Sequence, residues 1–295
     1  MKTPLILDGG MGRELNRSGA PFRQPEWSAL ALIEAPEFVR RAHDAFIAAG
    51  ADAITTNSYA VVPFHIGEAR FRKDGRMLAD RAGRIAREAA DAAPRKVTVA
   101  GSLPPLFGSY RPDLFVEKDA QGIAEILIAG LAPHVDVWLA ETQGSIAEAA
   151  ALRKALGNDP RPFWVSFTLE DGASAMPPRL RSQEPVEDAV RAALAWKAEA
   201  LLFNCSQPEV MAAALDVAGK TLGDAKLTLG VYANAFPPQD KDAEANAGLS
   251  DIRADLDPSR YLSFVQDWLK CGASIVGGCC GIGPEHIAAI RKAVS

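Results

Sequence analysis

The sequence predicts an α/β protein that folds as a single-domain (β/α)8 TIM barrel over residues 1–295. Two observations carry this prediction. Eight short runs rich in Val, Ile, Leu, Phe and Thr are almost continuously apolar, which is typical of parallel strands buried on both faces. Longer amphipathic segments with helical periodicity alternate with these runs, and we find no linker or low-complexity stretch that would divide the chain.

The predicted strands end in polar or glycine-rich residues. In chain order they fall at residues 5–10, 52–58, 96–102, 135–142, 162–168, 200–206, 227–234 and 274–280. The predicted helices cover about 35–52, 69–92, 118–133, 145–158, 184–200, 206–219, 257–272 and 283–294. The first of these shows the expected signals most clearly, because Pro36 suits a first helical turn and Gly50 suits a stop.

The composition excludes several classes of partner. The chain has 32 basic and 37 acidic residues, a net charge of −5, and its arginine-rich stretch alternates with acids and alanines. We therefore expect no nucleic-acid partner. Neither a signal peptide nor an apolar run of about 18 residues is found, so we expect a cytoplasmic protein with no membrane partner. The oligomeric state stays open, a homo-oligomer included.

The residues whose side chains could take part in binding or catalysis lie at the carboxyl ends of the predicted strands. They read DGG, TTNSY, GS, ET, SFT, NCS, YAN and GGCC, whereas the strand beginnings carry nothing comparable. Active sites of (β/α)8 barrels lie at the carboxyl ends of the strands. The sequence therefore places a candidate site at that end of the barrel.

Three cysteines form the most specific cluster. Cys205 ends the sixth predicted strand, and Cys279 and Cys280 end the eighth, so their thiols can converge at the mouth of the barrel. Three thiolates and one open position are typical of a catalytic zinc site. A vicinal disulfide and plain burial of small apolar groups are the alternatives. We interpret Cys271 as structural, and we expect His43 and His286 to be surface residues or hydrogen-bonded core residues.

The motifs together resemble one family. "DGGMGREL", "AGADAITTNSY", "AGSLPP", "AETQGS", "VSFTLEDG", "NCSQPEV" and "GGCCGIGPEHI" occur in the order found in homocysteine S-methyltransferases, from about residue 5 to residue 293. That family includes enzymes that use betaine or S-methylmethionine. The resemblance implies a zinc barrel with Cys205, Cys279 and Cys280 as ligands. It also implies methyl transfer from a sulfonium or betaine-type donor to homocysteine, which gives methionine.

The resemblance also implies roles for residues around the zinc. Asp8 and Glu141 would receive the ammonium group of homocysteine, and the backbone N–H groups of Gly9 and Gly10 would bind its carboxylate. Asn204 and Asn234 would orient a thiol or the substrate. Helix capping is the alternative for the two acids and the two amides.

Two aromatic residues match positions that surround the donor in the betaine enzymes. Trp27 and Tyr59 follow the first and second predicted strands and could bind a cationic methyl donor through their ring faces, with Phe236 as a further candidate. Packing at the base of a loop is the alternative for both. The long polar stretch 236–260 after the seventh strand is a candidate lid.

Two other functions are compatible with the same residues. The chain could be a methyl-acceptor module that works with a separate corrinoid protein, or a zinc- or thiol-binding barrel without catalytic activity.

Overall fold

The computed structural model describes residues 3–171, 177–238 and 251–294, and their strands form a parallel barrel. The strands are β1 (Leu5–Ile6), β2 (Ala53–Thr55), β3 (Thr98–Leu103), β4 (Val137–Gln143), β5 (Phe163–Phe167), β6 (Ala200–Asn204), β7 (Thr228–Tyr232) and β8 (Ile275–Val276). They pair in the order β1-β8-β7-β6-β5-β4-β3-β2, and every pairing is parallel. An isolated parallel bridge between Leu7 and Ala53 joins the two ends of this sheet and closes the ring. The predicted fold class is confirmed.

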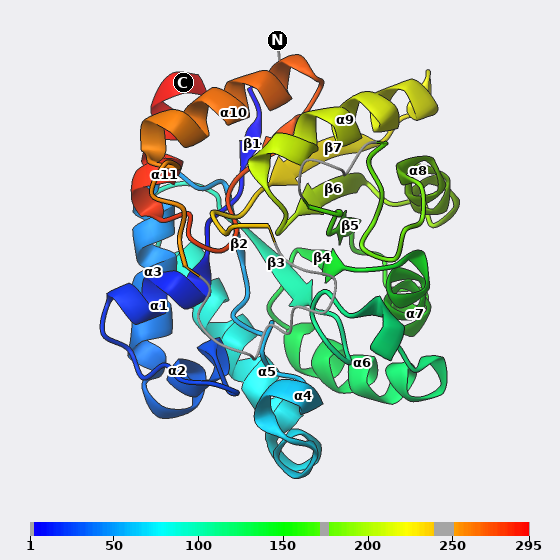
Figure 1. The fold of residues 1–295 in the computed structure, drawn as a ribbon. Helices are drawn as coiled ribbons and strands as arrows, with labels where there is room; N and C mark the ends of the chain where they lie inside the picture. The colour runs from blue at the N-terminus through cyan, green and yellow to red at the C-terminus, as the bar shows by residue number, and fades with distance from the viewer. Residues whose placement is uncertain (1–2, 172–176, 239–250, 295) are drawn as a thin grey trace.

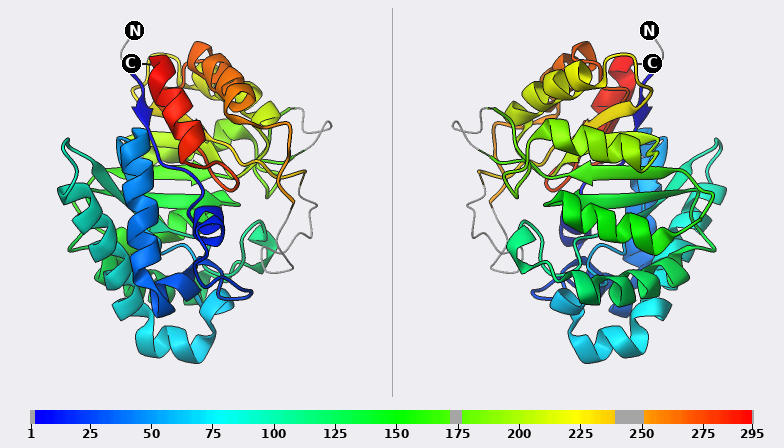
Figure 2. Two further views of the ribbon diagram at one scale, coloured as in Figure 1. Left: turned by 90° about the vertical axis from the view of Figure 1, so that its left-hand side faces the viewer. Right: turned by 90° about the vertical axis from the view of Figure 1, so that its right-hand side faces the viewer.

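Helices surround the strands (Figure 1). They are α1 (Met11–Arg17), α2 (Ser28–Glu34), α3 (Pro36–Ala49), α4 (Pro63–Ile66), α5 (Glu68–Asp91), α6 (Glu117–Leu131), α7 (Ile146–Leu156), α8 (Val186–Ala195), α9 (Pro208–Leu222), α10 (Pro258–Lys270) and α11 (Pro284–Val294). The two side views show α11 beside β1 and α3, so the last helix closes the outer layer against the first strand (Figure 2). No helix in the described part of the chain combines the length and the apolar character needed to cross a membrane.

The helix boundaries follow local signals. Helix α3 begins with Pro36 and is followed by Gly50, whose φ of 107° is left-handed and suits glycine. Helix α7 begins with a capping box, in which Ser145 Oγ accepts from Glu148 N and the Glu148 carboxylate accepts from Ser145 N. Helices α1, α2 and α4 were not predicted, because they have four to seven residues and are too short to show a helical period.

Two apolar layers hold the barrel together. The larger lies between the helices and the outer faces of the strands. The smaller uses alternate strand residues, such as Val137 and Leu139 of β4 and Ala200 and Leu202 of β6, and fills the barrel interior. In the described part of the chain these side chains occupy the centre of the barrel, and a cavity lies beyond them at the ends of the strands.

Strands β1 and β8 are shorter than predicted because their backbones leave regular pairing early. Pairing continues through single hydrogen bonds: Gly278 N–H donates to Asp8 O at 3.0 Å, and Cys279 N–H donates to Ala233 O at 2.8 Å. The residues after β8 are therefore fixed to both neighbouring strands. This holds the two consecutive cysteines in place.

Candidate metal and active site

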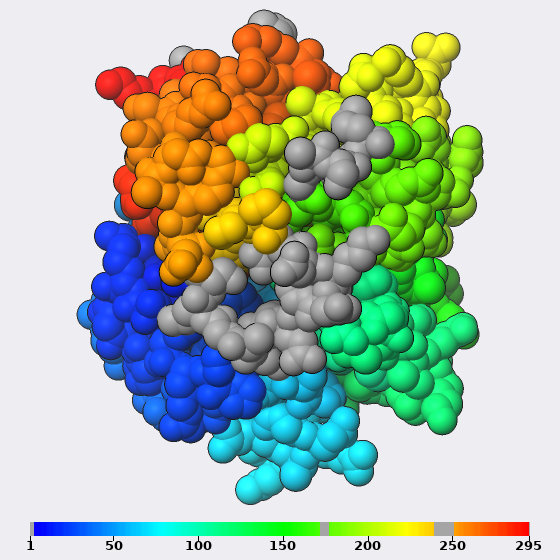
Figure 3. Space-filling model, viewed as in Figure 1, coloured from blue at the N-terminus to red at the C-terminus, as the bar shows by residue number. Residues whose placement is uncertain are grey.

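A cavity lies where the carboxyl ends of the strands meet. Of the residues named from the sequence, it is lined by Asp8, Gly9, Gly10, Trp27, Tyr59, Glu141, Cys205, Cys279 and Cys280. On the face of the molecule shown in Figure 3, the described residues just before α10, 251–257 (orange), lie beside the N-terminal part of the chain (blue). The guanidinium carbon of Arg13 lies 5.4 Å from the ring centroid of Phe236.

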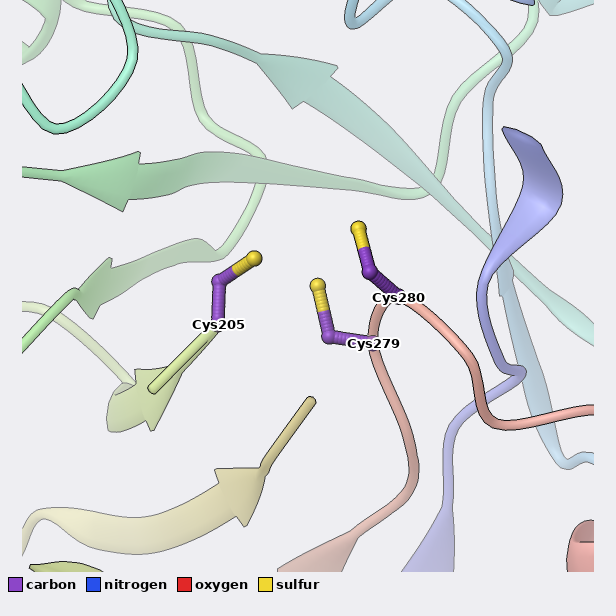
Figure 4. A group of neighbouring side chains, drawn as sticks. All are labelled: Cys205, Cys279 and Cys280. Carbon is purple, nitrogen blue, oxygen red and sulfur yellow. The ribbon is translucent and has the colours of Figure 1, made fainter. Parts of the chain in front are cut away.

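The three predicted cysteines meet in this cavity. Their Sγ atoms lie within 4.8 Å of one another, and the three side chains point toward a common centre (Figure 4). Two sulfurs bound to one tetrahedral zinc at about 2.3 Å would be about 3.8 Å apart, so small rotations of the side chains would suffice to place an ion. Cysteine sulfur is also a donor that zinc prefers. The residues therefore fit a zinc ion with three protein ligands.

The thiols are electrostatically unequal. Hydrogen bonds with the Cys279 and Cys280 thiols hold the pKa of Cys205 well below its usual range. The same interactions raise the pKa of Cys279 and of Cys280. Cys205 and Cys280 are 4% and 9% exposed, so charge on these two sulfurs is largely shielded from water, whereas Cys279 is only partly buried.

Glycines let two loops touch beside the cysteines. A Cβ atom on Gly10 would lie 2.6 Å from the carbonyl oxygen of Cys279, and one on Gly278 would lie 2.2 Å from Ile282 Cγ2. The Gly10 N–H, predicted to bind a substrate carboxylate, donates to Ile282 O at 2.9 Å in the ligand-free protein, so that role stays a prediction. Gly10 also provides close backbone packing behind the thiols.

The two predicted carboxylates are both buried in the cavity. Asp8 Oδ2 accepts from Thr55 N at 2.8 Å, and Glu141 Oε2 accepts from Ser102 Oγ at 2.5 Å. Burial raises the pKa of Asp8 to about 8, and the nearby charge of Glu141 adds to this. Burial also raises the pKa of Glu141 to about 7. Neither carboxylate caps a helix, so that alternative is excluded.

The two predicted amides lie behind the thiols. Asn204 accepts from Ser166 Oγ at 2.7 Å and donates to Thr142 Oγ1 at 2.8 Å, and its Nδ2 lies 4.0 Å from Cys279 Sγ. Asn234 Oδ1 accepts from Phe236 N at 3.2 Å. The Asn234 side chain also helps to lower the pKa of Cys205. Asn204 therefore contacts the thiol cluster, and neither amide is among the residues that line the cavity.

The aromatic side of the cavity is built around Trp27. Its ring packs edge-on against Tyr59, with centroids 6.0 Å apart, and stacks on His65 at 5.9 Å. His65 Nδ1 lies 2.7 Å from Pro25 O, which ties the stacked ring to the loop that carries Trp27. Trp27 and Tyr59 both line the cavity, as predicted, while Phe236 belongs to the apolar cluster around the cysteines.

Sequence reasoning missed Tyr110. This residue lies between β3 and α6, is 8% exposed, and places its hydroxyl 2.8 Å from Cys205 Sγ. The preceding residue, Ser109, bonds to the hydroxyl of Tyr59 at 2.8 Å. A tyrosine in an irregular loop gives no periodic signal, and its contact spans 95 residues of sequence.

Backbone strain is concentrated at the cavity. Six described residues other than glycine have a positive φ, and four of them line the cavity: Trp27 (48°), Tyr110 (64°), Thr142 (60°) and Cys205 (51°). Such conformations cost about 1–3 kcal/mol each and tend to persist at functional sites, where the surrounding structure enforces them.

The remaining predictions have mixed outcomes. His286 is a hydrogen-bonded core residue, with Nε2 3.0 Å from Leu256 O, as predicted. The prediction for His43 is wrong, because that ring is completely buried and neither nitrogen has a hydrogen-bond partner among the described residues. Cys271 is exposed at the end of α10, far from the thiol cluster in the fold. About half of the predicted lid, residues 239–250, lies outside the described residues.

Comparisons with known proteins agree on one family. Residues 5–294 match the family model described as homocysteine S-methyltransferase. The homocysteine S-methyltransferase of Escherichia coli is 30% identical, with 97% of this chain and 94% of that protein covered. A selenocysteine methyltransferase of Astragalus bisulcatus is 28% identical, with coverages of 100% and 97%.

A solved structure agrees with these relatives. The metallated form of the E. coli homocysteine methyltransferase MmuM superimposes with a TM-score of 0.79, at 28% identity and with 99% and 97% of the two chains covered. We conclude that this chain belongs to the homocysteine S-methyltransferase family, which is a family of methyltransferase enzymes.

Proposed function

We propose that this protein is a zinc-dependent methyltransferase that moves a methyl group from a sulfonium or betaine-type donor to the sulfur of homocysteine, giving methionine. S-methylmethionine, S-adenosylmethionine and betaine are the candidate donors. One observation carries the proposal: three thiols lie within 4.8 Å of one another in a cavity that also holds two buried carboxylates and two aromatic rings. Each group suits one part of the reaction.

Asp8 and Glu141 would hold the amino group of homocysteine. Burial is the main cause that raises the pKa of Asp8 to about 8 and that of Glu141 to about 7, and the charge of Glu141 adds a repulsion at Asp8. An ammonium group between them would offset that repulsion. Thr55 and Ser102 keep both acids oriented while the ligand is absent.

Zinc bound by Cys205, Cys279 and Cys280 would leave one position for the homocysteine sulfur and would favour its thiolate form, so that no general base is needed. The protein would contribute alignment. With the amino group fixed on the two carboxylates, the sulfur is directed toward the thiol cluster. The new bond joins this sulfur to the methyl carbon, and the donor leaves with the electron pair of its broken bond.

Trp27 and Tyr59 would bind the donor. A sulfonium or quaternary ammonium group is attracted to the faces of aromatic rings, by about 0.5–2 kcal/mol for each good contact. Both rings line the same cavity as the thiols. His65 behind Trp27 supports that ring without adding charge at neutral pH, because burial lowers its pKa to about 4.

Selenocysteine is an alternative acceptor, because two of the relatives are named selenocysteine methyltransferases, at 27% and 28% identity. A selenolate is a stronger nucleophile than a thiolate and would need less activation by a metal. The test should therefore include both acceptors.

The experiment incubates the zinc-loaded protein with homocysteine or selenocysteine and each candidate donor, and measures the methylated product by mass spectrometry. We expect one zinc per chain and product with at least one cationic donor. Cys280→Ala should lose both zinc and activity, while Cys271→Ala, which changes an exposed cysteine outside the cluster, should keep both.

Three outcomes would contradict the proposal. A Cys280→Ala protein with full zinc content and full activity would exclude the metal centre. Product formed only when a methylated corrinoid protein is added would favour the acceptor-module function. Zinc binding without any affinity for homocysteine or selenocysteine would favour a binding protein.

A further inference from the structure

Tyr110 makes a contact that the proposed reaction does not yet use. Its hydroxyl oxygen lies 2.8 Å from Cys205 Sγ, and both groups are buried. Tyr110 also lines the cavity and belongs to the apolar cluster that contains Cys205 and Cys280. The contact therefore lies beside the thiols, at the centre of the candidate site.

The direction of this hydrogen bond follows from the chemistry of the two groups. A thiolate that binds a metal has no proton and can only accept. A phenol keeps its proton at neutral pH, so the Tyr110 O–H is the donor. We propose that Tyr110 is a positioning residue of the metal centre, which fixes the orientation and the electron density of the Cys205 sulfur through this hydrogen bond.

The surrounding structure holds the contact in place from both ends. Tyr110 and Cys205 both have left-handed backbones, with φ of 64° and 51°, so neither backbone is in a relaxed conformation for its residue type. The guanidinium carbon of Arg181 lies 5.3 Å from the centroid of the Tyr110 ring. A cation over a phenol ring withdraws electron density and makes the O–H a better donor.

The same loop connects the metal side of the cavity to its aromatic side. Ser109 bonds to the Tyr59 hydroxyl at 2.8 Å, and the next residue bonds to Cys205. Two adjacent residues thus fix one ring of the proposed donor pocket and one metal ligand. Displacement of this loop would disturb both.

This inference rests on the zinc centre of the proposed function, and it predicts how the metal responds to loss of one hydroxyl. A hydrogen bond stabilises the thiolate and so strengthens zinc binding at neutral pH. Loss of a hydrogen-bond partner of a metal ligand typically costs about 10- to 100-fold in metal affinity. It also leaves more electron density on sulfur, which moves the sulfur-to-metal charge-transfer band of a cobalt(II) derivative to longer wavelength.

The experiment compares Tyr110→Phe with Tyr59→Phe. Tyr59 is the matched control, because it loses a hydroxyl in the same cavity that bonds to Ser109 rather than to a thiol. Zinc affinity is measured by competition with a chromophoric chelator, and the charge-transfer band is recorded after loading with cobalt(II). We expect Tyr110→Phe to weaken zinc binding about 10- to 100-fold and to shift the band, and Tyr59→Phe to do neither.

Several results would overturn the inference. An unchanged affinity and band in Tyr110→Phe would show that the contact does not act on the metal centre. Weaker binding with an unshifted band, or unfolding of the metal-free variant, would show that Tyr110 acts by packing alone. Failure of the proposed function is recognised separately, because the wild-type protein would then bind no metal or give no product.

Discussion

Asp8 offers the sharpest test of how the cavity binds an amino acid. Substitution of Asp8 by Asn preserves the shape of the side chain, and the remaining oxygen can still accept the Thr55 N–H, which donates at 2.8 Å in the structure. The fold should therefore be retained. The change removes one of the two charges that we propose for the ammonium group.

The size of the effect follows from the charge and the burial of this group. A hydrogen bond to a charged group contributes about 1.5–3 kcal/mol, so Asp8→Asn should weaken amino-acid binding about 10- to 150-fold. The pKa of Asp8 in the ligand-free site is raised to about 8, so its carboxyl must lose a proton before it can bind a cation. Ionisation of Asp8 should therefore raise the affinity about fivefold from pH 7 to pH 8 and by at most about twofold more above pH 8.

The assay is calorimetric titration with methionine, whose thioether does not ionise and so does not disturb the pH dependence. We expect the wild-type protein to gain affinity between pH 7 and pH 8, and Asp8→Asn to bind weakly with little gain, because Glu141 titrates near pH 7. Glu148→Gln is the matched control. It removes another buried carboxyl, with a pKa raised to about 7, which lies in the capping box of α7 rather than in the cavity.

The reasoning is refuted if Asp8→Asn binds methionine as tightly as the wild-type protein and with the same pH dependence. Equal losses in Asp8→Asn and Glu148→Gln would also refute it, because the effect would then come from general destabilisation.

Three further predictions concern other parts of the structure. Trp27→Leu should raise the KM for the donor about 2- to 30-fold and leave methionine affinity unchanged; a changed methionine affinity would contradict the assignment. Burial lowers the pKa of His43 to about 3, so the wild-type protein should lose about 2 kcal/mol of unfolding free energy between pH 8 and pH 5. His43→Leu should not show this loss, and urea unfolding at the two pH values measures the difference. Gly10→Ala should lower the unfolding free energy by about 1–3 kcal/mol and reduce the zinc content, because its Cβ would lie 2.6 Å from Cys279 O. The control Gly122→Ala, whose Cβ would have nothing within 4 Å, should have neither effect.

The sequence was sufficient to predict the barrel and the thiol cluster, and both predictions rest on strong physical signals. Strands buried on both faces must be apolar throughout, so the eight runs were recognisable. Cys205 and the pair Cys279 and Cys280 follow strands β6 and β8, and a closed parallel barrel brings those strand ends to one mouth. The barrel topology thus brings Cys205 close to Cys279 and Cys280, although more than 70 residues separate them in the sequence.

Features that depend on loop geometry could not be predicted in this way. The chain after β8 returns close enough for Ile282 O to accept the Gly10 N–H in the ligand-free protein, a contact that the sequence does not predict. Tyr110 was missed because its position depends on a loop whose backbone includes a left-handed residue. Residue type and spacing carry no information about such close approaches.

Cys205 and Thr142 show why left-handed backbone conformations occur among the residues that line the cavity. Consecutive strand ends diverge from the barrel axis, so a side chain continuing in regular strand geometry would alternate between the interior and the helices. Cys205 directly follows β6 and has a φ of 51°, and Thr142 within β4 has a φ of 60°. At each of these two positions the left-handed backbone turns the side chain toward the cavity. In a regular strand the same side chain would point toward the helices. Packing in the barrel beneath them offsets the free-energy cost of these conformations. A relaxed backbone at Cys205 would move its sulfur away from those of Cys279 and Cys280.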